Sequence, residues 1–266
     1  MTELLVIDDL SVSFRRYNGG LRREIVLCLN GVSLSMGRGE IVALIGESGA
    51  GKSLVAQSIF GLLPGNATLR GRISFAGVEL DAPRQAALRG RRISLVPQSI
   101  GALDPMARVE AQLRWAHARA AAPESFDAAA AFSRVGLAAD VARRYPHELS
   151  GGMARRLLIA MATTSRPELI VADEPTNGLD PENTDSLLAL LETARRLGSS
   201  VLLISHDLEA ALRIAGRVAV MRGGRIVGVE PAAAFSGRGE ALKYAYARAL
   251  WMALPGRGFG RDMEAA

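Results

Sequence analysis

The chain has 266 residues, of which 49% are hydrophobic, a formal net charge of +5 and one cysteine, Cys28. Its length suits one large domain, while a lone cysteine excludes an internal disulfide framework. The lack of an apolar run of about 18 residues, and of a basic segment at the N-terminus, predicts a cytoplasmic protein with neither a membrane span nor a secretory signal. The 32 basic residues form scattered arginine pairs, which favours a solvated surface over a nucleic-acid-binding patch.

Strand patterns dominate the first hundred residues. The run IVALIG is continuously apolar, which suits a strand buried on both faces of a parallel sheet. A helical pattern follows it and ends before Pro64 and Gly65. The predicted helix covers residues 52–63, and the predicted strands cover 4–14, 24–34, 41–46, 71–80 and 91–98.

The composition changes between about residues 104 and 165, where Ala, Arg and Leu dominate and strand formers are few. We expect a helical insertion there. Strand patterns then resume at 169–174 and 201–207 with a helical pattern between them, and 217–230 is typical of a hairpin that turns at two glycines. A last helix is expected over 241–254. Strands alternating with helices predict an α/β fold with a largely parallel sheet.

The strongest motif lies between the strand IVALIG and the helix that follows. It matches G-x-x-x-x-G-K-[ST], in which backbone N–H groups converge on phosphate oxygens at a helix N-terminus. Lys52 would reach the β- and γ-phosphates, and the Ser53 hydroxyl would bind Mg²⁺. Only Lys52 and Lys243 are lysines among the 32 basic residues, so a retained lysine suggests a need for a compact ammonium group. The predicted ATP-binding loop consists of Gly46, Glu47, Ser48, Gly49, Ala50, Gly51, Lys52 and Ser53.

A second motif, LIVADE, ends an apolar strand with two carboxylates, Asp173 and Glu174. Burying uncompensated charge costs several kcal/mol, and a metal ion would compensate for it. We therefore expect Asp173 to belong to the Mg²⁺ shell. Glu174 would orient or deprotonate water, a contribution typically worth about 10²–10⁴ in rate.

With LSGGMARR (149–156), these motifs resemble the ATP-binding cassette (ABC) family, whose signature is LSGGQ. The resemblance covers nearly the whole chain. It implies a P-loop NTPase core with a mostly parallel sheet, an N-terminal antiparallel β subdomain and a helical signature subdomain at about 104–165. We expect a single ATPase domain over residues 1–255, followed by a tail over 256–266.

The resemblance also assigns roles to single residues. Gln98 falls on the family's Q-loop glutamine, which contacts ATP and Mg²⁺ and takes part in catalysis. His206 falls on the catalytic switch histidine and Asp180 on the D-loop aspartate. Phe14 falls near the aromatic side chain that stacks on adenine, with Tyr17 as its rival.

In this family two cassettes pack head to tail, so each ATP lies between the P-loop of one subunit and the signature of the other. The resemblance implies that Ser150, Gly151, Gly152 and Asp180 act in trans. Met153 departs from the family's glutamine and removes a reciprocal capping box with Ser150, worth about 1 kcal/mol or less. Asn177-Gly178 also replaces the commoner Ser-Ala.

The segment PQSIGALDPM (97–106) and the C-terminal segment 244–255 resemble the oligopeptide, dipeptide and nickel importers. The implied assembly has a second ABC ATPase subunit, identical or paralogous, two transmembrane permeases and an extracytoplasmic substrate-binding protein. The chain would lie on the cytoplasmic face of the membrane as a peripheral subunit. For Tyr244, Tyr246 and Trp251, packing on the core stands beside any substrate role.

The transported solute is predicted to be a peptide or a nickel or metal chelate. The absence of a C-terminal cysteine cluster excludes an iron–sulfur site there and favours the nickel branch. The alternative function is a non-transport ABC ATPase that regulates a soluble or nucleic-acid partner. The importer-like Q-loop segment and the lack of a heptad insertion favour the importer.

Overall fold

The structure is a computed structural model that describes residues 3–18, 22–120 and 126–255. A six-stranded sheet forms its centre, in the order β10-β9-β3-β8-β7-β6. The strands from β9 to β6 run parallel to their neighbours, and β10 pairs antiparallel with β9. Its strands are β3 (Ile41–Gly46), β6 (Ile93–Val96), β7 (Leu169–Asp173), β8 (Ser200–Ser205), β9 (Arg217–Arg222) and β10 (Arg225–Pro231).

The second sheet is antiparallel and comes from the N-terminal part of the chain, as predicted. Its order is β2-β1-β4-β5. The predicted strand over 71–80 is interrupted at Ala76 and Gly77, which both have positive φ angles (51° and 78°) and form a tight turn. The four strands are β1 (Glu3–Asn18), β2 (Arg22–Gly37), β4 (Ala67–Phe75) and β5 (Val78–Glu79).

Eight helices surround the sheets in the described residues. The first ends at Phe60, three residues before the predicted end at 63, because Gly61 adopts a left-handed conformation with φ of 62°. Two short helices, α2 and α7, were not predicted, although Asp81 and Asp207 cap them. The helices are α1 (Lys52–Phe60), α2 (Ala82–Leu88), α3 (Val109–Ala120), α4 (Ala128–Arg134), α5 (Gly151–Thr163), α6 (Pro181–Arg196), α7 (Leu208–Leu212) and α8 (Ala245–Met252).

The central sheet is buried on both faces, which explains why its strands are continuously apolar. Along β3, Ile41, Ala43 and Ile45 belong to one hydrophobic cluster, and Val42 and Leu44 belong to the other. The first cluster contains side chains of α5 and α6, and the second contains those of α1 and the antiparallel sheet. This sandwich holds the carboxyl ends of the parallel strands rigidly at one edge, where α/β folds bind ligands.

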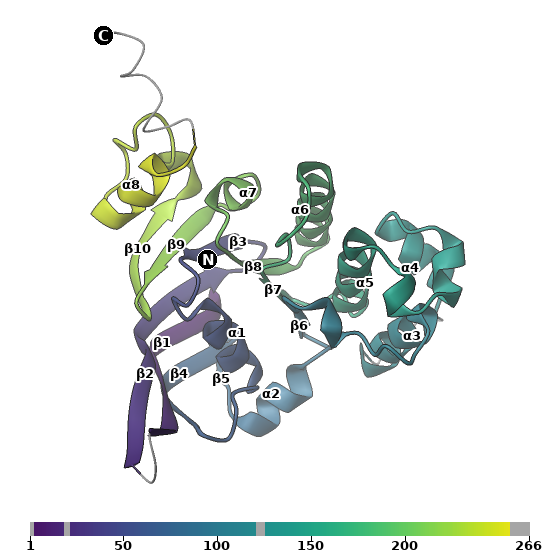
Figure 1. Ribbon diagram of the computed structural model, residues 1–266, viewed down its shortest axis with the longest axis horizontal. Helices are drawn as coiled ribbons and strands as arrows, with labels where there is room; N and C mark the ends of the chain where they lie inside the picture. Colours follow the sequence, from purple (N-terminus) through teal and green to yellow (C-terminus); the bar gives the residue numbers. More distant parts are fainter. Residues whose placement is uncertain (1–2, 19–21, 121–125, 256–266) are drawn as a thin grey trace.

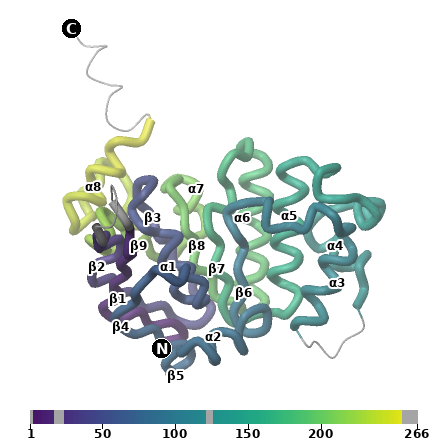
Figure 2. Tube along the Cα trace, turned by 60° about the horizontal axis from the view of Figure 1, so that its bottom comes forward, coloured from purple at the N-terminus to yellow at the C-terminus, as the bar shows by residue number. Residues whose placement is uncertain are grey.

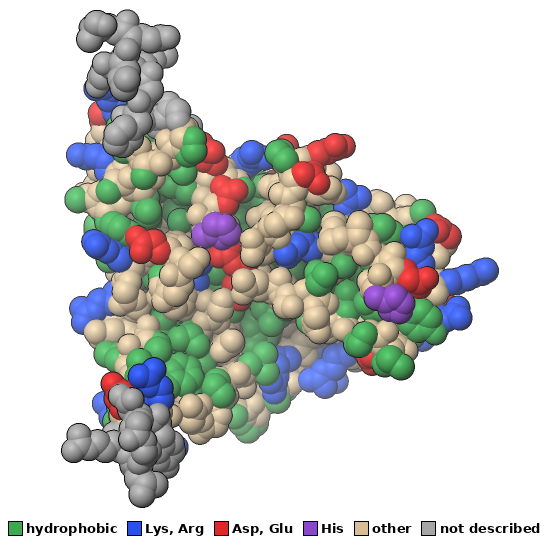
Figure 3. Space-filling view, in the orientation of Figure 1, with side chains coloured by type: hydrophobic (Ala, Val, Ile, Leu, Met, Phe, Trp, Pro, Cys, Tyr) green, Lys and Arg blue, Asp and Glu red, His purple; other side chains and the backbone are tan. Residues whose placement is uncertain are grey.

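The molecule is elongated. Figures 1 and 2 show α3, α4 and α5, which lie within the expected helical segment, at one end and the antiparallel sheet at the other. On the face drawn in Figure 3, basic and acidic side chains are interspersed, and this face has no extended patch of one sign. No helix in the described residues is both long and apolar enough to cross a membrane.

Candidate functional site

The glycine-rich loop joins the buried strand β3 to the first turn of α1, as the motif requires. Gly51 caps α1 in a left-handed conformation with φ of 101°, and no side chain caps the helix. A Cβ atom on Gly51 would lie 2.6 Å from the Leu29 side chain, and one on Gly46 would lie 2.4 Å from the Met221 carbonyl oxygen. Glycine is therefore required at both positions, and the N-terminus of α1 is left without a side-chain cap, as an anion site needs.

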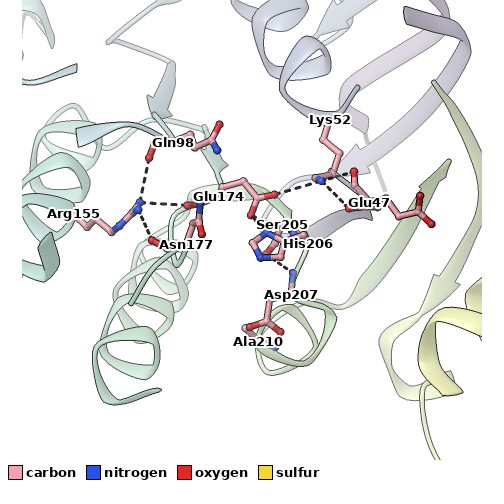
Figure 4. Close-up of polar contacts among 11 residues, drawn as sticks. Glu47, Lys52, Gln98, Arg155, Glu174, Asn177, Ser205, His206, Asp207 and Ala210 are labelled. Atoms are coloured by element: carbon pink, nitrogen blue, oxygen red, sulfur yellow. Dashed lines mark hydrogen bonds and ion pairs between the residues drawn. The ribbon is translucent and has the colours of Figure 1, made fainter. Parts of the chain in front are cut away.

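Lys52 lies beneath this loop with only 6% of its surface exposed. Its Nζ atom donates to the carbonyl oxygens of Gly46, at 2.7 Å, and Glu47, at 3.1 Å. The same Nζ lies 3.4 Å from Glu174 Oε1 (Figure 4). The ammonium group is thus held between the glycine-rich loop and the acid that follows β7.

Glu174 sits directly after β7 in a strained backbone conformation, with φ of 48°. Its amide donates to the Ile204 carbonyl oxygen of the neighbouring strand β8 at 2.8 Å. Its Oε2 atom lies 2.7 Å from His206 Nδ1 and accepts the His206 amide at 3.3 Å. Because β7 and β8 are adjacent and parallel, the acid after one and the histidine after the other meet at the sheet edge (Figure 4).

Asp173, the last residue of β7, is a buried acid. Burial raises the pKa of its carboxyl group, a hydrogen bond from Ser53 opposes this rise, and nearby Glu174 adds to it. Its Oδ1 atom is buried and has no hydrogen-bond partner. A carboxylate oxygen and a serine hydroxyl form a hard oxygen donor set, so these residues fit Mg²⁺. No cluster of three His, Cys, Asp or Glu residues that could hold a metal occurs in the described chain, so ligands of other kinds would complete the shell.

Arg155 connects three of the predicted motifs, and the sequence analysis missed it. It lies on α5, and its guanidinium donates to the carbonyl oxygens of Gln98, Glu174 and Asn177 at 3.3, 3.4 and 2.5 Å. Burial lowers the pKa of Arg155. The Gln98 side chain itself is exposed. The signature helix is therefore joined through one side chain to the Q-loop, the β7 acid and the D-loop (Figure 4).

The predicted signature lies at the N-terminus of α5, where the contacts are local. Ser150 caps the helix by accepting the Met153 amide at 3.3 Å, and no Gln side chain completes a capping box. A Cβ atom on Gly152 would lie 3.0 Å from Asn183 Oδ1. Asn183 in turn donates to Asp180, which caps α6. Within one chain the structure brings Gly152 to the D-loop side of the molecule.

Two aromatic residues, Phe14 and Tyr17, were predicted as candidates to stack on adenine. Phe14 lies on β1, is half-buried and packs against the second hydrophobic cluster. The Tyr17 side chain lies outside the described part of the structure. In the glycine-rich loop, Glu47, Ser48 and Gly49 are exposed, and Ala50 is buried.

Known proteins match both the sequence and the fold. The ABC transporter family matches residues 29–177. The probable peptide ABC transporter ATP-binding protein y4tR of Sinorhizobium fredii is 36% identical, and the match covers 97% of this chain and 79% of that protein. The probable D,D-dipeptide transport ATP-binding protein DdpD of Escherichia coli is 38% identical over 84% of this chain and 71% of its own length. The oligopeptide transport protein OppD of Bacillus subtilis is 34% identical over 85% of this chain and 66% of its own length.

Two solved structures give the same picture of the fold. The dimeric ATP-binding cassette MJ0796 bound to ADP and Pi superposes with a TM-score of 0.74 at 24% identity, and covers 86% of this chain and 99% of its own. An ATP-binding subunit of an ABC transporter superposes with a TM-score of 0.66 at 29% identity over 86% of this chain and 90% of its own. The predicted α/β fold with antiparallel and helical subdomains is confirmed.

Proposed function

Because this chain belongs to the ABC transporter ATPases, we propose that it is the ATP-hydrolysing subunit of a peptide importer and that its nucleotide site is built from the residues described above. One observation carries the assignment of catalysis. A single carboxylate, Glu174, is held between Lys52 and His206 beside the unpartnered oxygen of Asp173. Buried charge at a sheet edge is costly, and binding a polyphosphate with its cation would compensate for that cost.

The glycine-rich loop would bind the phosphates. The exposed residues Glu47, Ser48 and Gly49 and the uncapped start of α1 offer backbone N–H groups to an anion. Lys52 would exchange its loop carbonyl partners for phosphate oxygens. Phe14 would stack on adenine, with Tyr17 kept as its rival.

Ser53 and Asp173 would hold Mg²⁺, together with the side chain of Gln98. When bound, Mg²⁺ neutralises the charge on the transferred phosphoryl group. The hydrogen bond between Ser53 and Asp173 already places the two oxygen donors side by side. Gln98 follows β6, and Arg155 on α5 donates to its carbonyl oxygen. A movement of the helical subdomain would therefore reach Gln98 through Arg155.

Glu174 would act as the general base toward the attacking water, a role typically worth about 10²–10⁴ in rate. His206 is the matching positioning group, because its Nδ1 atom and its amide both reach Glu174 Oε2. The left-handed backbone of Glu174 and the hydrogen bond from its amide to β8 fix the carboxylate between this histidine and Lys52. The chain thereby orients the base before any substrate binds.

The signature residues Ser150, Gly151 and Gly152, with Asp180, would complete the site of a second ATPase subunit. Ser150 and its glycines are at least partly exposed at a helix N-terminus, and their contacts within the chain do not include the glycine-rich loop. Closure of the dimer would then depend on ATP, and hydrolysis would release it. The second subunit is a copy of this chain or a paralogue.

The peptide assignment rests on the relatives, which are named for peptides, D,D-dipeptides and oligopeptides. Their names do not support the nickel branch favoured by the sequence. The remaining partners in the proposal are two transmembrane permeases and an extracytoplasmic binding protein. The chain would be peripheral, on the cytoplasmic face of the membrane.

Glu174→Gln tests the catalytic assignment. We expect ATP hydrolysis by the assembled transporter to fall about 10²–10⁴-fold, with ATP binding retained, because the amide cannot accept the water proton. Phosphate release and nucleotide titration on the same preparation measure the two quantities. Glu182→Gln, on the first turn of α6, is the matched control. Near-normal turnover of the Glu174 variant would remove this residue as the base.

A further inference from the structure

The C-terminal helix α8 reaches the phosphate-binding loop through one side chain. The Tyr246 hydroxyl donates to Glu47 Oε1 at 2.7 Å, across 199 positions of sequence. Glu47 directly follows the first glycine of the loop, and its side chain is exposed. Packing on the core was one role that the sequence left open for this aromatic segment. Because Tyr246 also contacts Glu47, packing alone does not describe its role.

Arg222 supports the tyrosine ring from the strand side. Its guanidinium carbon lies 4.7 Å from the centre of the Tyr246 ring. Arg222 ends β9, whose residue Met221 pairs with Gly46 at the start of the glycine-rich loop. A cation, an aromatic ring and a carboxylate thus form a row along the edge of the loop.

The start of α8 is anchored independently of this row. Glu230 on β10 is fully buried and accepts the amides of Lys243 and Tyr244 at 2.6 and 2.9 Å. The Tyr244 ring covers Gly228 so closely that a Cβ there would lie 2.3 Å from it. Tyr246, in the first turn of the helix, is therefore presented to the loop by a rigid support.

The charge of the Glu47 carboxylate explains what the hydrogen bond from Tyr246 would do. A carboxylate beside a loop that binds a polyphosphate repels its ligand when free to turn toward it. In Figure 4 the Glu47 carboxylate lies on the far side of Lys52 from Glu174. The Tyr246 hydroxyl holds it by a hydrogen bond to a charged acceptor, which is stronger than a neutral one. Arg222, on the other side of this contact, packs against the Tyr246 ring.

We propose that Tyr246 is a positioning residue of the ATP site, which holds the Glu47 carboxylate away from the phosphates and thereby links α8 to nucleotide affinity. This inference rests on the proposed function, because it takes the glycine-rich loop to be the ATP site. In this proposal Tyr246 acts on the nucleotide through Glu47, to which it donates its hydrogen bond.

Tyr246→Phe, which removes only the hydroxyl, tests the proposal in the full chain. We expect the Kd for ATP with Mg²⁺, measured by titration calorimetry, to rise about three- to ten-fold, as the loss of one such hydrogen bond predicts. In the assembled transporter KM for ATP rises and kcat is unchanged. Tyr244→Phe, which removes a hydroxyl two residues away on a side chain 42% exposed, leaves affinity unchanged.

A second background separates positioning from packing. In a Glu47→Gln chain the acceptor carries no charge to be held away, so adding Tyr246→Phe changes the Kd less than about two-fold. An equal loss in both backgrounds, or a similar loss from Tyr244→Phe, would show that α8 acts only by packing and would overturn the proposal. So would an unchanged Kd for Tyr246→Phe in the wild-type background. If the wild-type chain itself fails to bind ATP, the proposed function fails first.

Arg222→Gln tests the row formed by Arg222, Tyr246 and Glu47 without altering α8. It removes the cation behind the ring, and we expect a smaller rise in the Kd than for Tyr246→Phe, again only when position 47 is Glu. Melting temperatures of all variants identify any that unfold. A loss of affinity for Arg222→Gln that persists in the Glu47→Gln background would contradict the proposal independently of Tyr246.

Discussion

The N-termini of α1 and α5 both carry glycines and are both proposed to contact phosphate, yet they are built in opposite ways. At α1, Gly51 leaves the helix without a side-chain cap, and the buried groups Lys52, Asp173 and Glu174 surround it. At α5, Ser150 caps the helix itself, and the residues around it are exposed or half-buried. The first site is assembled within the chain at a cost in buried charge. The second has its own side-chain cap, and in the proposed function it acts only in the site of a partner subunit.

Lys52→Ala should have the largest effect, because it removes the cation of the first site. We expect ATP affinity to fall by about 100-fold or more, because Lys52 would make charge-assisted hydrogen bonds to two phosphates, each worth about 1.5–3 kcal/mol. Equilibrium titration of the isolated chain measures it. Lys243→Ala, at the only other lysine, should leave affinity unchanged. Unaltered ATP binding by the Lys52 variant would contradict the assigned role.

Ser150→Arg tests the second site, where the effect should appear only in the assembly. A bulky cation in place of the serine would block the approach of the partner's nucleotide, so hydrolysis by the assembled transporter should fall about ten-fold or more. ATP binding by the isolated chain should not change. Ser133→Arg, at an exposed serine of α4, is the control. Full activity of an assembly carrying Ser150→Arg would rule out completion of the site in trans.

Asp173→Asn tests the cost of buried charge at the first site through its effect on the melting temperature. Burial raises the pKa of Asp173, so its contribution to stability is complete below the unfolded pKa and is lost as the pH rises through the folded value. At pH 7 the nucleotide-free variant should therefore melt a few degrees above the wild type. The gap should close as the pH falls toward 4. A lower melting temperature for the variant at pH 7 would mean that Asp173 stabilises the empty fold.

Ser150→Ala should have the smallest effect, and of opposite sign. The hydroxyl caps Met153, and losing an N-cap costs about 1 kcal/mol, so the melting temperature should fall by about 2–4 °C. Differential scanning calorimetry measures the shift. Ser133→Ala provides the matched comparison. No change for Ser150→Ala would mean that this helix end is not stabilised by its cap.

Several local features followed directly from the chain. The glycine spacing, the buried run IVALIG and the lysine predicted a tight loop between a strand and a helix, which the structure contains, because such a turn depends on residues near one another in sequence. The helix α2 was missed, although Asp81 with a proline in the first turn is a helix start signal. The sequence also left the peptide and nickel branches open, because the C-terminal segment resembles both.

The sequence by itself determined the family and a sheet buried on both faces, and it singled out the acids and the lysine of the candidate site. Only the tertiary structure decided how they meet. Glu174 reaches His206 because β7 and β8 are neighbours, Arg155 joins three loops through their backbone carbonyls, and Tyr246 crosses from α8 to Glu47. Motifs are visible in sequence because their geometry is local, whereas contacts between distant segments depend on strand order and on the packing of each helix.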